Sequence, residues 1–291
     1  MRKDRRKFMH NLSLAAGGML LAPSTQILDR YFIPERRIKN FGLQLYTLRD
    51  DIIQDVKGVL QKVASAGYTQ IESYDGPNGM WWGMGAKEFK NFVGDLGMTI
   101  TSSHCDIFKD FEQKVEEAAS IGVKYLICPW LGKQDNLDKY KAAAEDFNKK
   151  GEMCRKNGIG FGYHNHAYSF EAVDGIYPQD ILMHETDSSL VTFEMDMYWV
   201  HAAGEKIEKW LNKYKNRFKL CHIKDFSRHP VIDNSLNSVD LGKGVIDWNS
   251  ALKTAFKNGM EYFVVEQEAY PGTTPIDAIR ANAAFMKKMK I

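Results

Sequence analysis

The chain has 291 residues, about twice the usual length of one domain, but one barrel of eight strand–helix units alone takes roughly 250 residues. Hydrophobic residues make up 44% and charged residues 26%, an ordinary globular composition that excludes disordered, collagen-like and coiled-coil proteins. Thirty-nine basic residues against 37 acidic ones give a net charge of +2, so we expect no nucleic acid as a partner.

Residues 1–25 have the layout of an export signal. Five basic residues and one acidic residue precede an apolar run over 12–22 and give this segment a net charge of +4. Without residues 1–25, the net charge of the rest of the chain is +2 − 4 = −2. The pair Arg5–Arg6, followed by Phe8, resembles a twin-arginine signal, so we expect export to the periplasm, with 26–40 as a lead-in. The apolar run is shorter than the about 20 residues that span a bilayer, so no stable membrane anchor is expected. The alternative is a basic leader on a cytosolic enzyme.

From residue 41 onward, short apolar runs alternate with longer amphipathic stretches. The runs are brief and rich in β-branched and aromatic residues, as is typical of parallel strands buried on both faces. They cover 41–46, 68–74, 98–104, 123–129, 159–166, 190–196, 217–224 and 262–268.

The stretches between these runs predict helices. Examples are 51–66, 111–121, 136–157, 204–214 and 273–290. A glycine stands just before five of the strands, where it would end a helix in a left-handed conformation; these are Gly67, Gly97, Gly122, Gly158 and Gly259. The alternation predicts an α/β fold, a single (β/α)₈ TIM barrel over 41–291. A doubly wound sheet is disfavoured, because no glycine-rich loop follows the first strand.

The cysteines do not indicate a disulfide framework or structural zinc. Cys105, Cys128, Cys154 and Cys221 have no paired spacing, and most lie in apolar runs. We therefore expect free, buried thiols.

Polar residues gather where the predicted strands end, which is where a barrel of this kind builds its site. They are Gln44, Tyr46, Glu72, His104, Trp130, His164, Asn165, His166, Asp196, His222, Lys224, Asp225, Glu266 and Glu268. Convergence of His, Asp and Glu predicts one divalent metal ion, with Mn, Zn or Co all suitable. The preferred ligands, one from each of the last four strands, are His164, Asp196, His222 and Glu266.

Each of these residues also has a simpler interpretation. A strand-end His can be a hydrogen-bonded structural residue, Asp196 can cap the next helix, and Glu266 can be a paired buried carboxylate. Glu194 lies on the same strand face as Asp196 and is an alternative ligand. We favour Asp196 as the ligand because it lies nearer the strand end. Trp81 and Trp82 can form either an aromatic lid over a sugar or a satellite core.

Eight segments in this order resemble one family, the xylose-isomerase-like barrels called sugar phosphate isomerases/epimerases. The segments are FGLQLYTLRD, GYTQIESYDG, SSHCD, ICPWLG, FGYHNHAYSFE, EMDMYWVHAAG, RFKLCHIKD and VVEQE, within 41–290. They are most similar to the branch near inosose dehydratases and enzymes acting on 3-keto-glycosides. The resemblance implies a divalent metal on His164, Asp196, His222 and Glu266.

The fifth strand departs from the family pattern. Many relatives carry Glu where this chain has His164, and relatives with YHNH often follow it with a Glu–Phe pair where this chain has Ser169–Phe170. Three residues therefore compete as the fifth-strand ligand: His164, His166 and Glu171.

The chemistry implied is proton abstraction next to the carbonyl of a keto-sugar or related polyol, with the metal stabilising the enediolate. Reprotonation gives isomerisation or epimerisation, whereas expulsion of a β-substituent gives dehydration or glycoside elimination. The candidate bases are Glu72, His166 and Glu268, and Lys224 and His104 bind hydroxyls or donate protons. We expect the remaining substrate contacts from Tyr46, Trp130, Glu171 and Trp199.

Three alternatives to an isomerase remain: a lyase of the inosose dehydratase or 3-keto-glycoside type, a catalytically silent sugar-binding barrel, and a nuclease resembling endonuclease IV. The last is disfavoured by the charge of −2 and by the small number of histidines at the site. We expect an unphosphorylated small-molecule sugar as the partner, and the chain can form a homo-oligomer.

Overall fold

The computed structural model describes residues 37–229 and 237–291. The predicted export signal, and all but the last four residues of the predicted lead-in, lie outside the described residues. Among the described residues, no helix combines the length and the apolar character that crossing a membrane requires.

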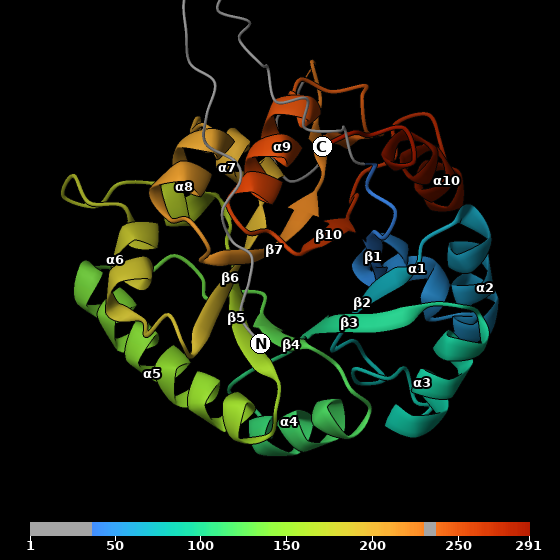
Figure 1. Ribbon diagram of the computed structural model, residues 1–291, viewed down its shortest axis with the longest axis horizontal. Coiled ribbons are helices and arrows are strands. Elements are labelled where there is room, and N and C mark those ends of the chain that lie inside the picture. Colours follow the sequence, from blue (N-terminus) through green and yellow to red (C-terminus); the bar gives the residue numbers. More distant parts are fainter. Residues whose placement is uncertain (1–36, 230–236) are drawn as a thin grey trace, which may run out of the picture. The chain divides into compact units, whose positions relative to one another are not determined.

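Eight parallel strands close into one barrel, which confirms the predicted fold (Figure 1). Each strand lies inside the range predicted for it. The strands are β1 (Gly42–Gln44), β2 (Gln70–Tyr74), β3 (Thr99–His104), β4 (Tyr125–Cys128), β5 (Gly160–His164), β6 (Val191–Asp196), β7 (Phe218–Ile223) and β10 (Tyr262–Val265). Sequential strands are neighbours, and β1 pairs with β10 to close the ring.

Helices surround the strands (Figure 1). They are α1 (Arg49–Ile52), α2 (Val56–Ala66), α3 (Ala86–Asp95), α4 (Phe111–Ser120), α5 (Leu137–Lys156), α6 (Pro178–Glu185), α7 (Met197–Ala202), α8 (Ile207–Lys213), α9 (Trp248–Lys257) and α10 (Pro275–Met286). The prediction of one continuous helix over 51–66 was wrong, because two helices, α1 and α2, cover this range. Asp55 interrupts it, because its carboxylate accepts the backbone N–H of Gly58 at 2.8 Å and starts a new helix.

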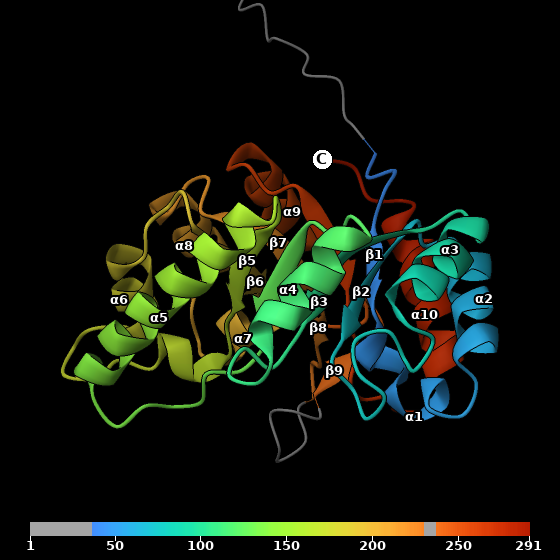
Figure 2. The same ribbon diagram turned by 90° about the horizontal axis from the view of Figure 1, so that it is seen from below.

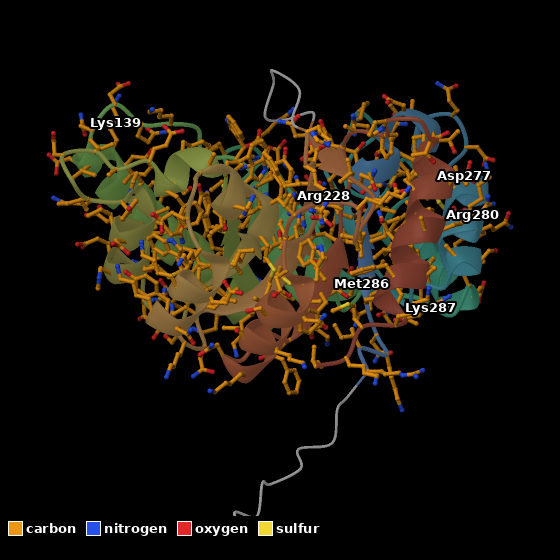
Figure 3. The ribbon with its side chains drawn as sticks, turned by 90° about the horizontal axis from the view of Figure 1, so that it is seen from above. Lys139, Arg228, Asp277, Arg280, Met286 and Lys287 are labelled. Atoms are coloured by element: carbon orange, nitrogen blue, oxygen red, sulfur yellow. The ribbon has the colours of Figure 1, made fainter. Side chains whose placement is uncertain are left out.

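The helices run back against the direction of the strands. In Figure 3, α10 passes from Asp277 and Arg280 to Met286 and Lys287 at the opposite end of the barrel, where Lys287 Nζ donates to the carbonyl of Ala66 at 2.9 Å. All five glycines that were predicted to precede strands have a positive φ, between 76° and 102°, with the largest value at Gly67. This confirms the predicted left-handed helix ends. The loops after the strands are therefore left at the other end of the barrel.

Four short elements lie at the end of the barrel where the strands end. β8 (Asp225–Phe226) and β9 (Ser238–Val239) form an antiparallel pair beyond β7. In Figure 2 they lie on the same side of the barrel as α1 and α7, which are the first α-helices after β1 and β6 in the chain. Two 3-10 helices, η1 (Leu45–Leu48) and η2 (Ala167–Phe170), follow β1 and β5.

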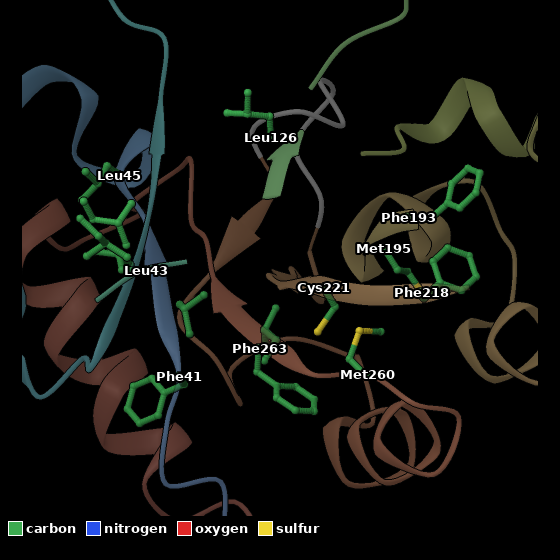
Figure 4. Close-up of a cluster of buried hydrophobic side chains, with 14 of the residues drawn as sticks. Phe41, Leu43, Leu45, Leu126, Phe193, Met195, Phe218, Cys221, Met260 and Phe263 are labelled. Atoms are coloured by element: carbon green, nitrogen blue, oxygen red, sulfur yellow. The ribbon is translucent and has the colours of Figure 1, made fainter. Parts of the chain in front are cut away.

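Buried apolar side chains fill the space around the strands. Figure 4 labels ten of them: Phe41, Leu43, Leu45, Leu126, Phe193, Met195, Phe218, Cys221, Met260 and Phe263. All four cysteines are free and buried, as predicted. Trp81 and Trp82 are 5% and 3% exposed, donate from their indole nitrogens to Glu117 and Ser73, and belong to the main hydrophobic core, so the lid interpretation was wrong.

Two helical glycines make a matched test of this packing. A Cβ on Gly151 in α5 would lie 2.5 Å from the carbonyl oxygen of Leu190, whereas nothing lies within 4 Å of one on Gly94 in α3. We expect Gly151→Ala to lower the free energy of unfolding by about 2 kcal/mol through overpacking. Gly94→Ala should raise it by about 0.5–1 kcal/mol through helix propensity. Urea denaturation measures both, and equal effects would contradict the close contact between α5 and Leu190.

Candidate metal centre and active site

A cavity of about 720 Å³ opens at the ends of the strands. Ten of the predicted site residues line it: Tyr46, His104, Trp130, His164, His166, Glu171, Trp199, Lys224, Glu266 and Glu268. The other three, Glu72, Asp196 and His222, are fully buried and do not line it. Sequence reasoning missed Tyr74, Lys133 and Tyr168 in the lining. Lys133 and Tyr168 lie beyond the strand ends on which it relied, and Tyr74 is the last residue of β2, a strand for which only Glu72 was considered.

Strand register explains how the buried polar layer forms. Gln44, Glu72 and Ser102 are register partners on β1, β2 and β3, and both outer members donate to the Glu72 carboxylate, at 2.7 and 2.5 Å. Register also pairs His164 with Glu194, and Asp196 with His222. Polar side chains on neighbouring strands are thus brought to the same level inside the barrel.

Two groups of potential ligand atoms share His222. One contains His104, His164, Glu194 and His222, and the other contains Asp196, His222 and Glu266. Within each group, the donor atoms lie within 4.8 Å of one another. Glu194, which the alternation of β6 had offered as the rival of Asp196, therefore belongs to the same polar cluster as Asp196.

Three of the four preferred ligand candidates, Asp196, His222 and Glu266, fall in one of these groups, and His164 falls in the other. His222 Nδ1 lies 3.1 Å from Glu266 Oε2 and 3.9 Å from Asp196 Oδ2, and His164 Nε2 lies 3.7 Å from the same Asp196 oxygen. Two imidazoles and two carboxylates form a donor set that fits Zn, Mn or Co. Asp196 also caps α7, since Oδ1 accepts the Trp199 N–H at 3.0 Å, so the capping interpretation holds as well.

The rivals for the fifth-strand ligand lie elsewhere. Glu171 is at the cavity rim, where its carboxylate pairs with Lys133 Nζ at 2.7 Å. His166 lies further out than His164, and its ring contacts Trp130 and Tyr168 at centroid distances of 4.5 and 5.7 Å. Of the three candidates, only His164 occurs in a group of potential metal ligands among the described residues.

A buried ammonium lies beside the predicted ligands. Lys224 is 1% exposed, and its Nζ lies 3.1 Å from Asp196, 2.9 Å from Glu266 and 2.5 Å from Glu268. Burial alone lowers the pKa of Lys224, but the three carboxylates outweigh it and raise that pKa well above its usual range. Burial raises the pKa of Glu266, but Lys224 and His222 outweigh it and lower that pKa overall.

The remaining titratable groups of the cavity differ in charge. Burial lowers the pKa of His104, but Glu72 and Glu194 outweigh it and raise that pKa to about 9. Burial, helped by Lys224, lowers the pKa of His166 to about 3, so this ring is neutral. Burial raises the pKa of Glu268, against the opposing effect of Lys224.

An aromatic wall bounds one side of the cavity. Trp130, which is 59% exposed, contacts the rings of His166 and Tyr168. The Tyr168 hydroxyl accepts the backbone N–H groups of Leu131 and Gly132 at 3.2 and 3.1 Å, which ties the loop after β4 to η2. An exposed indole held in this way offers a fixed ring face to a ligand.

A family model described as "Xylose isomerase-like TIM barrel" matches residues 60–289. The chain is 29% identical over 171 residues to an inosose dehydratase of Clostridium perfringens, covering 54% of this chain and 57% of that protein. It thus spans about half the length of the curated relatives that it matches. A crystal structure of a sugar phosphate isomerase/epimerase from Parabacteroides distasonis is similar, with a TM-score of 0.75 and 29% identity over 86% of this chain and 93% of that one. A zinc-bound structure of a protein called IOLI has the same fold, with a TM-score of 0.69 and 16% identity over 84% and 95% of the two chains.

Proposed function

The chain belongs to the family of xylose isomerase-like TIM barrels, and on this basis we propose that it is a divalent-metal-dependent enzyme of the sugar isomerase or epimerase type. We propose that it removes a proton next to the carbonyl of a keto-sugar or related polyol. The observation that carries the proposal is the cluster of His164, Asp196, His222 and Glu266 at the strand ends, beside a cavity of about 720 Å³ that Lys224 and Glu268 line.

In this proposal the four residues hold one divalent ion. When bound, such an ion supplies Lewis-acid stabilisation of negative charge on a substrate oxygen. The protein's own contribution is to hold the substrate beside a base and a proton donor.

Of the three candidate bases, Glu268 fits best. It lines the cavity, and its raised pKa is nearer the range that suits a general base. Glu72 does not line the cavity, and its carboxylate oxygens are already within hydrogen-bond distance of Gln44, Ser102 and His222. The low pKa of His166 makes that ring a weak proton acceptor, so we assign it to hydroxyl binding.

Lys224 is the proposed proton donor and hydroxyl ligand. Its ammonium bonds to Glu268 and faces the cavity, so a proton removed by the carboxylate and one supplied by the ammonium act at neighbouring points. His104, with its raised pKa, is a second hydrogen-bond donor in the lining of the cavity.

We propose that the substrate is unphosphorylated. Both lysines that line the cavity already pair with carboxylates, Lys133 with Glu171 and Lys224 with three others. Phosphate recognition would instead use arginines or free backbone N–H groups. Export to the periplasm, away from the main pool of sugar phosphates, forms part of this proposal and rests on the sequence of residues 1–25.

Elimination is the second candidate reaction, and the match to inosose dehydratases favours it specifically. It shares the proton-abstraction step with isomerisation. The two reactions differ in the step after it, which is either return of the proton to carbon or loss of a β-substituent.

Deuterium exchange tests the shared step. The protein loaded with Mn²⁺, Zn²⁺ or Co²⁺ would be incubated with keto-sugars, keto-cyclitols and keto-glycosides in deuterated water and followed by NMR. We expect deuterium at the carbon next to the carbonyl, and loss of this exchange in Glu268→Gln, because that variant keeps the shape of the side chain but not its basicity.

The other outcomes separate the alternatives. Sugar binding without exchange would indicate a silent binding protein, and cleavage of nucleic acid would indicate a nuclease. Turnover of a sugar phosphate, with none of the neutral analogue, would overturn the unphosphorylated substrate.

A further inference from the structure

We propose that Glu72 and Glu194 are positioning residues, each of which holds the proton-bearing ring nitrogen of one predicted metal-binding histidine. The other nitrogen of that histidine is then free to face the predicted metal-binding carboxylates. This inference rests on the metal site of the proposed function and assigns a role to two buried carboxylates that do not line the cavity.

His222 lies between two carboxylates. Its Nε2 lies 2.6 Å from Glu72 Oε1, and its Nδ1 lies 3.1 Å from Glu266 Oε2. A neutral imidazole has one N–H donor and one lone pair. In this assignment the N–H is on Nε2, which makes the shorter contact and makes it to a carboxylate that is not a predicted ligand, and the lone pair of Nδ1 faces Glu266 and Asp196.

His164 repeats the arrangement with its nitrogens exchanged. Its Nδ1 lies 3.1 Å from Glu194 Oε2, and its Nε2 lies 3.7 Å from Asp196 Oδ2. A proton on Nδ1 is therefore held by Glu194, and the lone pair of Nε2 faces Asp196. The two rings thus present opposite nitrogens to the same carboxylate, Asp196, which lies 3.9 Å from His222 Nδ1.

Both inner carboxylates are themselves held in place. Glu72 is fully buried and accepts from Gln44 Nε2 and Ser102 Oγ, which its register neighbours on β1 and β3 supply. Glu194 is fully buried, and its Oε2 also bonds to His104 Nε2 at 2.7 Å. Among the described residues, Glu194 Oε1 has no hydrogen-bond partner, so the hydrogen bonds of this carboxylate all go to the two histidines.

The physical effect of such a carboxylate is to fix the tautomer and orientation of the ring and to make its free nitrogen more basic. Loss of a partner of this kind typically costs about 10- to 100-fold in metal affinity. Substitution of a metal ligand would lower metal affinity further, whereas substitution of a residue that only fills space would leave metal affinity unchanged.

The first measurement is the tautomer of each ring in the full-length, zinc-loaded protein, read from long-range ¹H–¹⁵N correlation spectra. We expect the proton on Nδ1 in His164 and on Nε2 in His222. The reverse pattern in either ring would overturn the assignment for that ring, and this measurement needs no variant.

The second measurement is Co²⁺ affinity, from competition with a chromophoric chelator, together with the visible spectrum of the bound ion. We expect Glu194→Leu and Glu72→Leu to weaken Co²⁺ binding about 10- to 100-fold while one ion per chain still binds. Glu194→Gln and Glu72→Gln, whose amide oxygens can still accept the N–H, should lose less and guard against misfolding of the leucine variants. Ser103→Ala on β3 is the matched control, because the Ser103 hydroxyl donates to the carbonyl of His104 and to neither carboxylate, and it should leave Co²⁺ affinity unchanged.

The outcomes separate this inference from the proposed function. No Co²⁺ binding by the unchanged protein would overturn both. Unchanged affinity in both leucine variants would overturn the positioning role alone. Two ions per chain in the unchanged protein, and one in Glu194→Leu, would also overturn it, because Glu194 would then be a ligand.

Discussion

Replacing Asp196 with asparagine is expected to remove the bound divalent ion and to lower kcat/KM for the exchanging substrate about a thousand-fold, which corresponds to roughly 4 kcal/mol of transition-state stabilisation. The carboxylate lies near both histidines and Lys224, so loss of its charge weakens the whole donor set. Asparagine keeps a side-chain oxygen that can accept the Trp199 N–H, so the cap of α7 is preserved. Metal content per chain and exchange rate are the two measurements.

Glu171→Gln is the matched control for metal content. Glu171 was a rival ligand in the sequence, but its carboxylate pairs with Lys133 at the rim, so we expect one ion per chain in this variant. His164→Ala should lose the ion. The opposite pattern, with metal lost in the Glu171 variant and kept in the His164 variant, would show that the fifth-strand ligand is misassigned.

Replacing Asp225 with alanine should lower the free energy of unfolding by about 4 kcal/mol, because the carboxylate organises the loop after β7. Its two oxygens accept the backbone N–H groups of Phe226, Gly242, Gly244 and Ile246, at 2.9, 2.8, 3.1 and 3.3 Å. Alanine would leave these donors without their acceptor, and each hydrogen bond to a charged group contributes about 1.5–3 kcal/mol. The total is less than the sum, because water reaches part of the loop once it loosens.

Urea denaturation of Asp225→Ala and Asp225→Asn measures this effect. Asparagine keeps one acceptor oxygen, so the free energy of unfolding of Asp225→Asn should fall by about half as much as that of Asp225→Ala. Gly244→Ala perturbs the same loop by another route, since a Cβ there would lie 2.1 Å from Asp225 Oδ1 and 2.4 Å from the carbonyl of Phe226. A change below about 1 kcal/mol in Asp225→Ala would show that the loop does not depend on this carboxylate.

The sequence alone determined the barrel. Eight apolar runs of strand length, five glycines before strands and helical stretches between them are local patterns, because periodicity and helix ends depend on neighbouring residues. Each predicted strand range contains an observed strand. The interruption at Asp55 was missed, because the apolar stripe of the predicted helix continues across it.

The sequence also brought forward the residues of the site, since strand ends in such a barrel meet at one opening. It could not assign them to levels inside that opening. Only the tertiary structure shows that Glu72, Asp196 and His222 lie beneath the cavity, that Glu171 lies at the rim, and that Trp81 and Trp82 belong to the core.

The physical reason is register. The level at which a side chain sits depends on how each strand is shifted against its neighbour, and that shift includes an irregularity between β6 and β7 at Phe193/Glu194. The register between β6 and β7 pairs Asp196 with His222. The register between β5 and β6 pairs His164 with Glu194. No pattern within a single strand carries this information, so the sequence predicted which residues meet, and the three-dimensional structure decided which nitrogen faces which carboxylate.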